Sequence, residues 1–233
     1  MFSGGYGIYI IITMVFAGIG ALASARLKSK FKHYARIPMA GGLSGAEVAQ
    51  KMMDDYNIND VQIVMGKGFL SDHYNPQTKT VSLSPEVYQG RSISSAAVAA
   101  HECGHVVQHA EAYKWLAFRS KMVPVVQLAS RAQGILLMFA VGGIAGGFGG
   151  GLILQITIVA FAITALFAVV TLPVEFDASK RALAWLESSN LASDVEVEGA
   201  KDALWWAAMT YVVSALSALT ILFWLILRSQ SRR

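Results

Sequence analysis

Two histidines and a glutamate in the stretch His101-Glu102-Cys103-Gly104-His105 have the spacing of a catalytic metal site. On an α-helix, residues i and i+4 lie on one face with Cβ atoms about 5–6 Å apart, which lets two imidazoles bind one ion. His101 and His105 are therefore the predicted zinc ligands. Glu102 lies about 100° around the helix from His101, where its carboxylate can take a proton from a water that the metal activates. The pattern predicts the ligands and the general base of an H-E-x-x-H metallopeptidase.

The alternative is a chance coincidence on an ordinary amphipathic helix. With five His and eight Glu among 233 residues, about 0.004 matches to H-E-x-x-H are expected by chance. The preceding residues 92–100 begin with serines that can cap a helix and continue with strong helix formers. The motif is therefore predicted to lie on a helix and to bind Zn²⁺.

Two later residues on the same helix are candidates for a third ligand. His109 continues the face of the motif histidines, but it lies about 12 Å along the axis from His101, too far to share its ion. Glu111 takes the position of the third metzincin histidine, yet Gln108 stands where that motif needs a glycine to bend the chain. Glu111 is therefore expected to point away.

Cys103 and His73 are the remaining candidates near the motif. Cys103 is the single cysteine, which excludes a disulfide within the chain, and its offset of two from each histidine turns it to the opposite helix face. We expect it in the core. His73 is either a solvated loop residue or a donor that stabilises the transition state.

The composition is that of a membrane protein. Hydrophobic residues make up 55% of the chain and charged residues 15%, against about 25% charged residues in ordinary soluble proteins. The net charge of +4 does not indicate nucleic-acid binding, because the basic residues stand beside apolar segments without an aromatic-basic stripe. The expected partners are a lipid bilayer and a peptide or membrane-protein substrate, with no nucleic acid.

Apolar segments long enough to cross a membrane are predicted at residues 5–25, 125–146, 152–172 and 207–227. The first is interpreted as an uncleaved anchor. A signal peptide is the alternative, because Ala23-Ser24-Ala25 resembles a cleavage site, but no basic region precedes it. Residues 125–172 form a predicted helical hairpin with the glycine tract 146–151 as its external turn. Arg131 would lie inside its first span and would have to reach the interface or a polar cavity.

The basic residues after the first span predict the orientation. They are expected to stay in the cytoplasm, and they are Arg26, Lys28, Lys30, Lys32 and Arg36. Residues 26–121 are then a cytoplasmic, α+β, zincin-like domain that carries the motif helix, and residues 173–203 add cytoplasmic helices. The predicted fold class is mainly α, with about four transmembrane helices. The protein should be a multi-pass plasma-membrane protein whose active site faces the cytoplasm.

Local signals place further elements around the motif. Ser44 to Glu47 is a capping box that starts a helix to about residue 56. Residues 61–65 and 78–84 alternate like strands and predict a small hairpin or sheet, with a turn at Asn75-Pro76. The strand before the motif helix either pairs with an extended substrate or is purely structural. A second capping box, residues 193–196, starts the helix that enters the last span.

A helix is also predicted to open at Leu172-Pro173, with the proline in its first turn. The hairpin before it returns the chain to the cytoplasmic side. Glu175 therefore emerges on the same side of the membrane as His101.

Together these features resemble the bacterial membrane proteins called neutral zinc metallopeptidases, and more distantly the heat-shock membrane protease and CAAX-prenyl endopeptidase group. In that group a downstream Glu-x-x-Ala-Asp pattern supplies the third zinc ligand, and its Asp supports a zinc-bound histidine. Glu175 and Ala178 match this pattern, so the resemblance implies Glu175 as the third ligand; an interfacial carboxylate is the alternative. Ser179 replaces the Asp, so that contact is made by its hydroxyl, supplied by Asp177, or absent.

The predicted function is that of a gluzincin-like zinc metalloendopeptidase acting on membrane proteins or peptides. Its catalytic residue is Glu102 and its metal ligands are His101, His105 and Glu175. A zinc-binding membrane scaffold without catalysis is one alternative, which would need four protein ligands. A site-2-type intramembrane protease is another, but no Leu-Asp-Gly ligand motif follows and the motif helix leads into charged residues.

Overall fold

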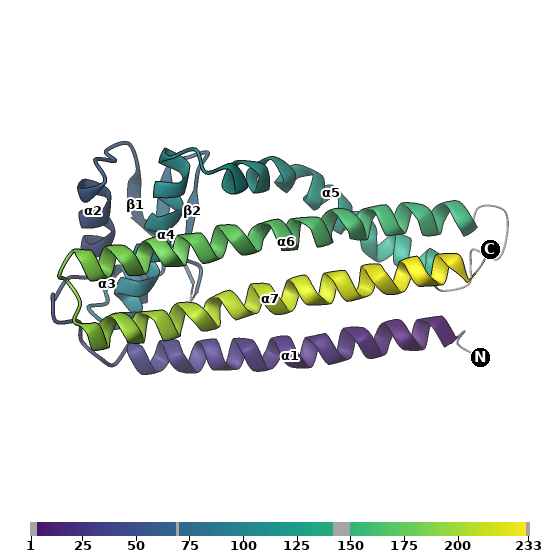
Figure 1. Cartoon of the computed structure of the whole chain (residues 1–233), viewed down its shortest axis with the longest axis horizontal. Helices are drawn as coiled ribbons and strands as arrows, with labels where there is room; N and C mark the ends of the chain where they lie inside the picture. The colour runs from purple at the N-terminus through teal and green to yellow at the C-terminus, as the bar shows by residue number, and fades with distance from the viewer. Residues whose placement is uncertain (1–3, 69, 142–149, 232–233) are drawn as a thin grey trace. The chain divides into compact units, whose positions relative to one another are not determined.

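The computed structural model describes residues 4–68, 70–141 and 150–231, and the described chain is mainly helical with a small sheet (Figure 1). The predicted glycine turn at 146–151 lies mostly outside these residues. The elements are α1 (Gly4–Tyr34), α2 (Gly45–Asp55), β1 (Gln62–Met65), β2 (His73–Asn75), β3 (Thr80–Leu83), α3 (Pro85–Gln89), α4 (Ile93–Ala110), α5 (Lys114–Val141), α6 (Gly150–Ser188) and α7 (Asp194–Gln230).

The chain divides into two compact units. Unit 1 consists of Met1–Ala23, Phe118–Leu172 and Thr210–Arg233, and unit 2 consists of Ser24–Ala117 and Pro173–Met209. The long helices α1, α5, α6 and α7 each contribute residues to both units.

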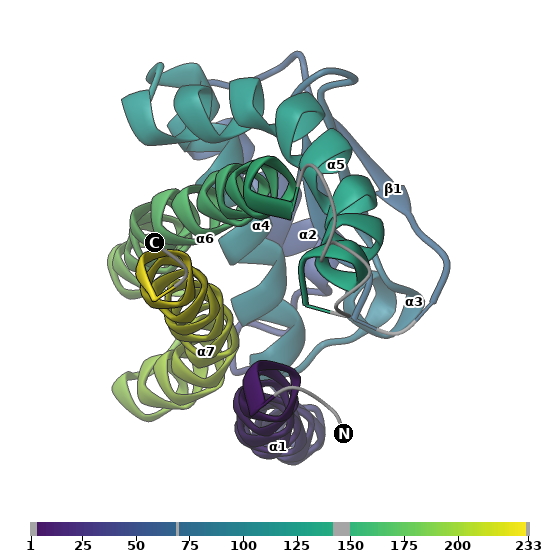
Figure 2. The same ribbon diagram turned by 90° about the vertical axis from the view of Figure 1, so that its right-hand side faces the viewer.

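Four of the described helices are long and apolar enough to cross a membrane, as the sequence predicts. The segments are Gly7–Tyr34, Lys114–Phe139, Gly151–Ser188 and Asp194–Gln230. Within unit 1, α6 and α7 lie side by side (Figure 2), and Leu154 and Phe161 of α6 form a buried cluster with Leu225 of α7.

Helix α6 runs without interruption through Pro173, so the prediction that a new helix opens there is wrong. Proline lacks an N–H and removes one hydrogen bond from the interior of a helix. Tertiary packing compensates for this loss, because Val174, Ala178 and Ala182 follow at the i, i+4 spacing of a single helix face and are completely buried. Glu175 therefore lies within a continuous helix and not at a helix start.

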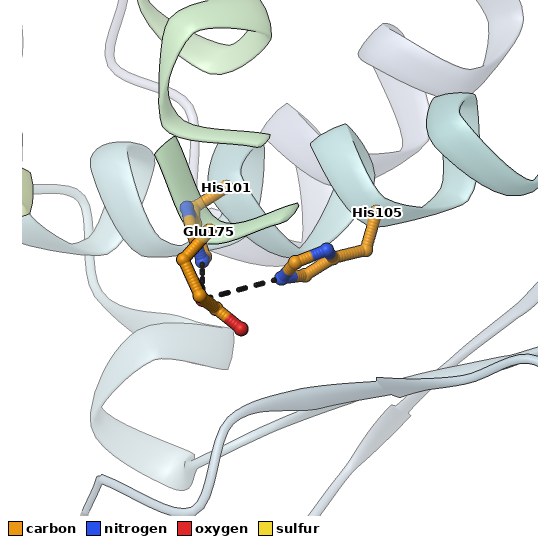
Figure 3. Close-up of side chains that lie close together, drawn as sticks. All are labelled: His101, His105 and Glu175. Atoms are coloured by element: carbon orange, nitrogen blue, oxygen red, sulfur yellow. Dashed lines mark ion pairs between the residues drawn. The ribbon is translucent and has the colours of Figure 1, made fainter. Parts of the chain in front are cut away.

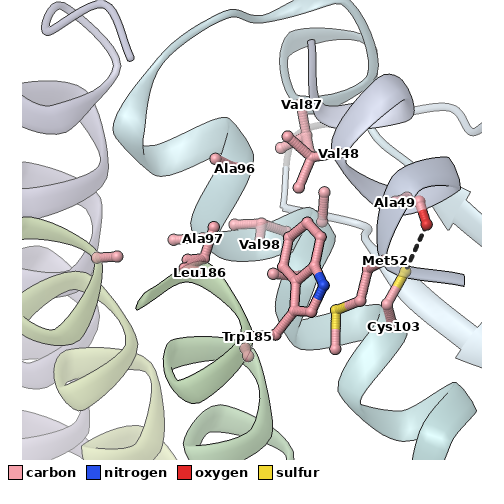
Figure 4. Close-up of a cluster of buried hydrophobic side chains, with 14 of the residues drawn as sticks. Val48, Ala49, Met52, Val87, Ala96, Ala97, Val98, Cys103, Trp185 and Leu186 are labelled. Atoms are coloured by element: carbon pink, nitrogen blue, oxygen red, sulfur yellow. Dashed lines mark hydrogen bonds between the residues drawn. The ribbon is translucent and has the colours of Figure 1, made fainter. Parts of the chain in front are cut away.

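Unit 2 has a core of the soluble-protein type, which contains side chains of α2, α4 and α6 (Figure 4). Trp185 packs in this core and donates from Nε1 to Asp55 Oδ2 at 3.0 Å. Cys103 is buried as expected, with Sγ 3.6 Å from the carbonyl oxygen of Ala49, and burial raises the pKa of its thiol. The predicted capping box at Ser44 and Glu47 is confirmed and begins α2.

The sheet has the strand order β1-β3-β2. Strand β3 pairs in parallel with β1 and antiparallel with β2. A small sheet was expected, but direct hairpin pairing of the two predicted strands is wrong. The chain between them folds back as β2, and Asn75 Oδ1 accepts from the backbone N–H of Gln77 at 2.9 Å to form the turn before β3. Strand β3 is therefore central, and its neighbours β1 and β2 occupy the sheet edges.

Candidate metal centre

Helix α4 carries the H-E-x-x-H residues, and it begins where the sequence places its start. The Ser92 hydroxyl accepts from the backbone N–H of Ser95 at 3.3 Å, which caps the helix. Most of α4 is buried, including the motif residues Glu102 and His105. The motif therefore lies on a helix held by packing on several sides.

His101, His105 and Glu175 point toward one another from α4 and α6 (Figure 3). Oε2 of Glu175 lies 3.4 Å from Nε2 of His101 and 3.6 Å from Nε2 of His105. Among the described residues, these three form the group whose ligand atoms all lie within 4.8 Å of one another. The structure thus brings Glu175 to two histidines that lie 74 and 70 positions before it in the sequence.

The close approach of α4 and α6 depends on Gly104. A Cβ atom on Gly104 would lie 2.5 Å from the carbonyl oxygen of Ala178, well inside a van der Waals contact. Ala178 is itself completely buried and has the smallest side chain that keeps a Cβ. Small residues on both helices therefore let the carboxylate of α6 reach the histidines of α4.

The separations between Glu175 and the two histidines match those of a zinc site. Two ligand atoms that are each about 2.1 Å from a tetrahedral ion lie about 3.4 Å apart, and the two nitrogen–oxygen separations are 3.4 and 3.6 Å. Two imidazoles and one carboxylate are also the donor set of a catalytic zinc site, which leaves the fourth position for water or substrate.

The remaining ring nitrogen of each histidine has a hydrogen-bonding partner. His101 Nδ1 lies 3.1 Å from the Ser179 hydroxyl, and His105 Nδ1 lies 3.0 Å from Oε1 of Gln108. Of the three possibilities that the sequence left open for the missing Asp, the hydroxyl of Ser179 makes the contact. Because both Nδ1 atoms are engaged, both Nε2 atoms are directed at Glu175.

Burial and neighbouring charges set the proton affinities in this site. Desolvation raises the pKa of Glu102 above its ordinary value, and the nearby histidines oppose that shift when they are charged. Burial alone would lower the pKa of His105, but the carboxylate of Glu175, together with the charge of Glu102 and the hydrogen bond to Gln108, outweighs burial and raises the pKa. Glu102 thus lies in a desolvated environment where a carboxylate holds a proton more readily than in water.

The other candidate residues lie outside this cluster. His73 is an exposed residue of β2 with Nδ1 2.8 Å from the carbonyl oxygen of Ser71. His109 Nδ1 lies 2.7 Å from the Tyr74 hydroxyl. Glu111 is half exposed and accepts from Nη1 of Arg181 at 2.7 Å. None of these three belongs to the group of possible ligands among the described residues.

Sequence reasoning missed the role of Gln108. It treated this residue only as the absence of a metzincin glycine, whereas Gln108 is completely buried and contacts both His105 and α6. A signal was available, because a polar residue three positions after a predicted ligand lies on the same helix face. Its partner Asp177 was named only as a possible substitute for the missing aspartate.

A family described as "Putative neutral zinc metallopeptidase" has a sequence model that matches residues 9–230. The chain belongs to this family. Consistent with membership, the chain is 37% identical over 212 residues to "Putative membrane protease YugP" of Bacillus subtilis (strain 168). The aligned residues cover 91% of this chain and 92% of the relative. No solved structure matches the chain. The family resemblance found in the sequence is confirmed, and membership supports zinc and protease activity. The name of the relative and the four described apolar helices suggest a membrane location.

Proposed function

We propose that this family member is a membrane zinc metalloendopeptidase of the gluzincin-like H-E-x-x-H type, with His101, His105 and Glu175 as its metal ligands. The observation that carries this proposal is the convergence of the three ligand atoms within 4.8 Å in a chain of a zinc metallopeptidase family. The donor set leaves one coordination position open, which hydrolysis requires.

When bound, zinc would act as a Lewis acid that polarises the scissile carbonyl and makes water a better nucleophile. Glu102 is the general base of the proposed reaction: its carboxylate takes a proton from the attacking water. The same carboxyl group then delivers that proton to the nitrogen of the leaving amine. Burial raises the pKa of Glu102, so its carboxyl group holds the proton more readily between its removal from water and its delivery to the amine.

The test is Glu102→Gln, compared with Glu198→Gln as an isosteric control on an exposed carboxylate of α7. We expect Glu102→Gln to retain zinc and to lose cleavage by about 10²–10⁴-fold, the usual contribution of general-base catalysis. Glu198→Gln should stay close to wild type. Zinc content and cleavage of a peptide library by the purified protein are the measurements. Cleavage by Glu102→Gln within about tenfold of wild type would contradict the assigned role.

A zinc-binding scaffold without catalysis is the second candidate. It would hold one ion with four protein ligands, whereas the described residues supply three. Stoichiometric zinc in the wild type without cleavage of any library peptide would favour the scaffold. A site-2-type intramembrane protease is disfavoured, because α4 is not one of the four described helices that could span a membrane.

The proposed orientation has the catalytic residues on the cytoplasmic side and the glycine tract outside. Its basis is the basic cluster that follows the first span, since Lys and Arg are retained in the cytoplasm. Impermeant thiol labelling of intact cells tests it, with low background because Cys103 is buried. A cysteine at Gly149 should react and one at Gln77 should be protected. The opposite pattern would invert the topology.

Substrates of the proposed enzyme are membrane proteins or peptides at the cytoplasmic face. Since β3 is central, an extended substrate would pair instead with the edge strand β2, which packs against α4. Methylation of alternate backbone nitrogens in a cleaved peptide should then abolish cleavage, and cleavage that tolerates every such methyl group would exclude strand pairing.

A further inference from the structure

Two hydrogen-bond acceptors on α6 fix the orientation of the side-chain amide of Gln108. Its Nε2 donates to the carbonyl oxygen of Val174 and to Oδ2 of Asp177, each at 2.8 Å. A carbonyl and a carboxylate can only accept, so the nitrogen of the amide must face α6. Oε1 of Gln108 consequently faces His105 Nδ1, 3.0 Å away.

This orientation has a consequence for His105. An amide oxygen can only accept, so His105 must carry a hydrogen on Nδ1 to form the bond. In the neutral imidazole the lone pair then resides on Nε2, the atom directed at Glu175. Gln108 thus selects the one tautomer of His105 that can bind a metal at the centre of the cluster.

Asp177 is held in place by a further chain of charged contacts. Its Oδ2 accepts from Nε of Arg181 at 2.6 Å, and Nη1 of the same guanidinium donates to Oε2 of Glu111 at 2.7 Å. The guanidinium carbon also lies 5.9 Å from the centre of the Tyr113 ring. Arg181 therefore links the carboxylate of α6 to residues at and beyond the end of α4.

His101 lacks a comparable constraint from its own partner. The Ser179 hydroxyl lies 3.1 Å from His101 Nδ1, and a hydroxyl can donate as well as accept. That contact is therefore compatible with either tautomer of His101. The two predicted ligands differ in how firmly their neighbours set the metal-binding form.

We propose that Gln108 is a positioning residue that fixes the tautomer and ring orientation of His105 for zinc, and that Asp177 and Arg181 fix Gln108 in turn. This inference rests on the proposed role of His101, His105 and Glu175 as zinc ligands. Partners that orient a metal-binding histidine typically change metal affinity by about 10–100-fold when they are removed.

The first test is zinc affinity of the purified full-length chain in detergent, measured by competition with a chelator. Gln108→Leu should bind zinc about 10–100-fold more weakly than wild type. Gln133→Leu is the matched control, because Gln133 also donates two hydrogen bonds to α6, to Ala160 O at 3.0 Å and Thr164 Oγ1 at 2.7 Å. The control should keep wild-type zinc affinity, and equal zinc affinity of wild type and Gln108→Leu would overturn the proposal.

A second pair of variants separates positioning from packing, and it remains informative if Gln108→Leu does not fold. Gln108→Glu keeps an acceptor for His105 but sets a carboxylate against Asp177, so zinc binding should weaken. In Gln108→Glu/Asp177→Asn the new amide can donate to the new carboxylate, which restores the hydrogen bond between positions 108 and 177, while the bond to the carbonyl oxygen of Val174 stays lost. The double variant should bind zinc at least about tenfold more tightly than Gln108→Glu.

Absence of this recovery would mean that Gln108 acts only through packing and would overturn the proposal. The zinc content of the wild-type chain tests the proposed function independently of the Gln108 variants. A wild-type chain without stoichiometric zinc contradicts the metal site itself. A wild-type chain that binds zinc while all Gln108 variants bind equally well contradicts only the positioning role.

Discussion

Unit 1 and unit 2 both use a glutamine to hold a neighbouring helix against α6, but the two glutamines differ in what else they contact. Gln133 in unit 1 donates to a backbone carbonyl and a threonine hydroxyl of α6. Gln108 in unit 2 makes the equivalent pair of bonds, and its oxygen also contacts His105. The same interhelical bond thus joins helices in unit 1, while in unit 2 it also orients a candidate metal ligand.

A pair of helical glycines shows the same contrast. A Cβ on Gly104 in unit 2 would collide with the backbone of Ala178 at 2.5 Å, whereas a Cβ on Gly134 in unit 1 would meet no atom within 4 Å. Gly104 therefore allows two helices to approach closely beside the site, and Gly134 has no such role. Substitutions that are alike in chemistry should have unlike effects in the two units.

The largest effect is expected for Glu175→Ala. Two histidines alone hold zinc poorly, so this variant should lose both metal and cleavage, while Glu111→Ala, which removes only a partner of Arg181, should keep most of both. Chelator competition on the two purified variants measures the difference. If Glu111→Ala lost zinc and Glu175→Ala kept it, the third ligand would be assigned to the wrong glutamate.

Alanine should destabilise the protein at Gly104 but not at Gly134. Gly104→Ala forces α4 and α6 apart and should destabilise the protein by about 1–3 kcal/mol, as overpacking does. It should also weaken zinc binding, because Glu175 moves away from the histidines. Gly134→Ala should be neutral or stabilise by about 0.5–1 kcal/mol, since alanine is the better helix former. Thermal unfolding in detergent with and without zinc checks both, and equal destabilisation by the two variants would contradict the comparison.

A smaller effect is expected for Ser179→Ala. The hydroxyl contacts His101 but does not select its tautomer, so zinc affinity should fall by about tenfold at most, the low end for such partners. Ser188→Ala on the same helix removes a hydroxyl that donates to its own helix backbone, at Trp185 O, and should leave zinc affinity unchanged. A loss for Ser179→Ala larger than that for Gln108→Leu would reverse the ranking of the two histidine partners.

The part of the site that one helix encodes could be predicted from the sequence. The spacing of His101, Glu102 and His105 predicts a shared face because the helix period is fixed. The assignment of Glu175 as the third ligand rests on family resemblance, since no local rule states which distant carboxylate packs against a given helix. The pairing of Gln108 with Asp177 depends on how closely α4 and α6 approach, and spacing along the chain does not report that distance.

The fold was predictable to a similar extent. Hydropathy finds the four long apolar helices because each must be apolar over about 20 residues to span a bilayer. It does not show that α6 continues through Pro173, because burial of Val174 and Ala178 outweighs the local preference of proline. The alternation of apolar and polar residues does not reveal that β1 and β3 pair in parallel either, because strand direction is set by the path of the connecting chain.

The smallest effect is expected at the capping box of α2 in unit 2, where Glu47 lies in the first turn of the helix. The helices α1 and α6, which begin in unit 1, have no acidic residue in the first turn. Bonds from the Ser44 backbone and hydroxyl, and then from Arg91, lower the pKa of Glu47. Because the folded-state pKa is lowered, the contribution of this carboxylate to stability is fully present above the ordinary pKa and is lost as the pH falls through the folded-state value.

Glu47→Gln should therefore lower the unfolding temperature at neutral pH, and its difference from wild type should shrink to nothing as the solution is acidified below the lowered pKa of Glu47. Val48→Ala in the same helix removes buried carbon but no ionisable group, so its difference from wild type should stay constant with pH. Thermal unfolding of the three proteins over a pH series makes the comparison. A Glu47→Gln difference that is independent of pH would show that the ionised carboxylate contributes nothing to the cap.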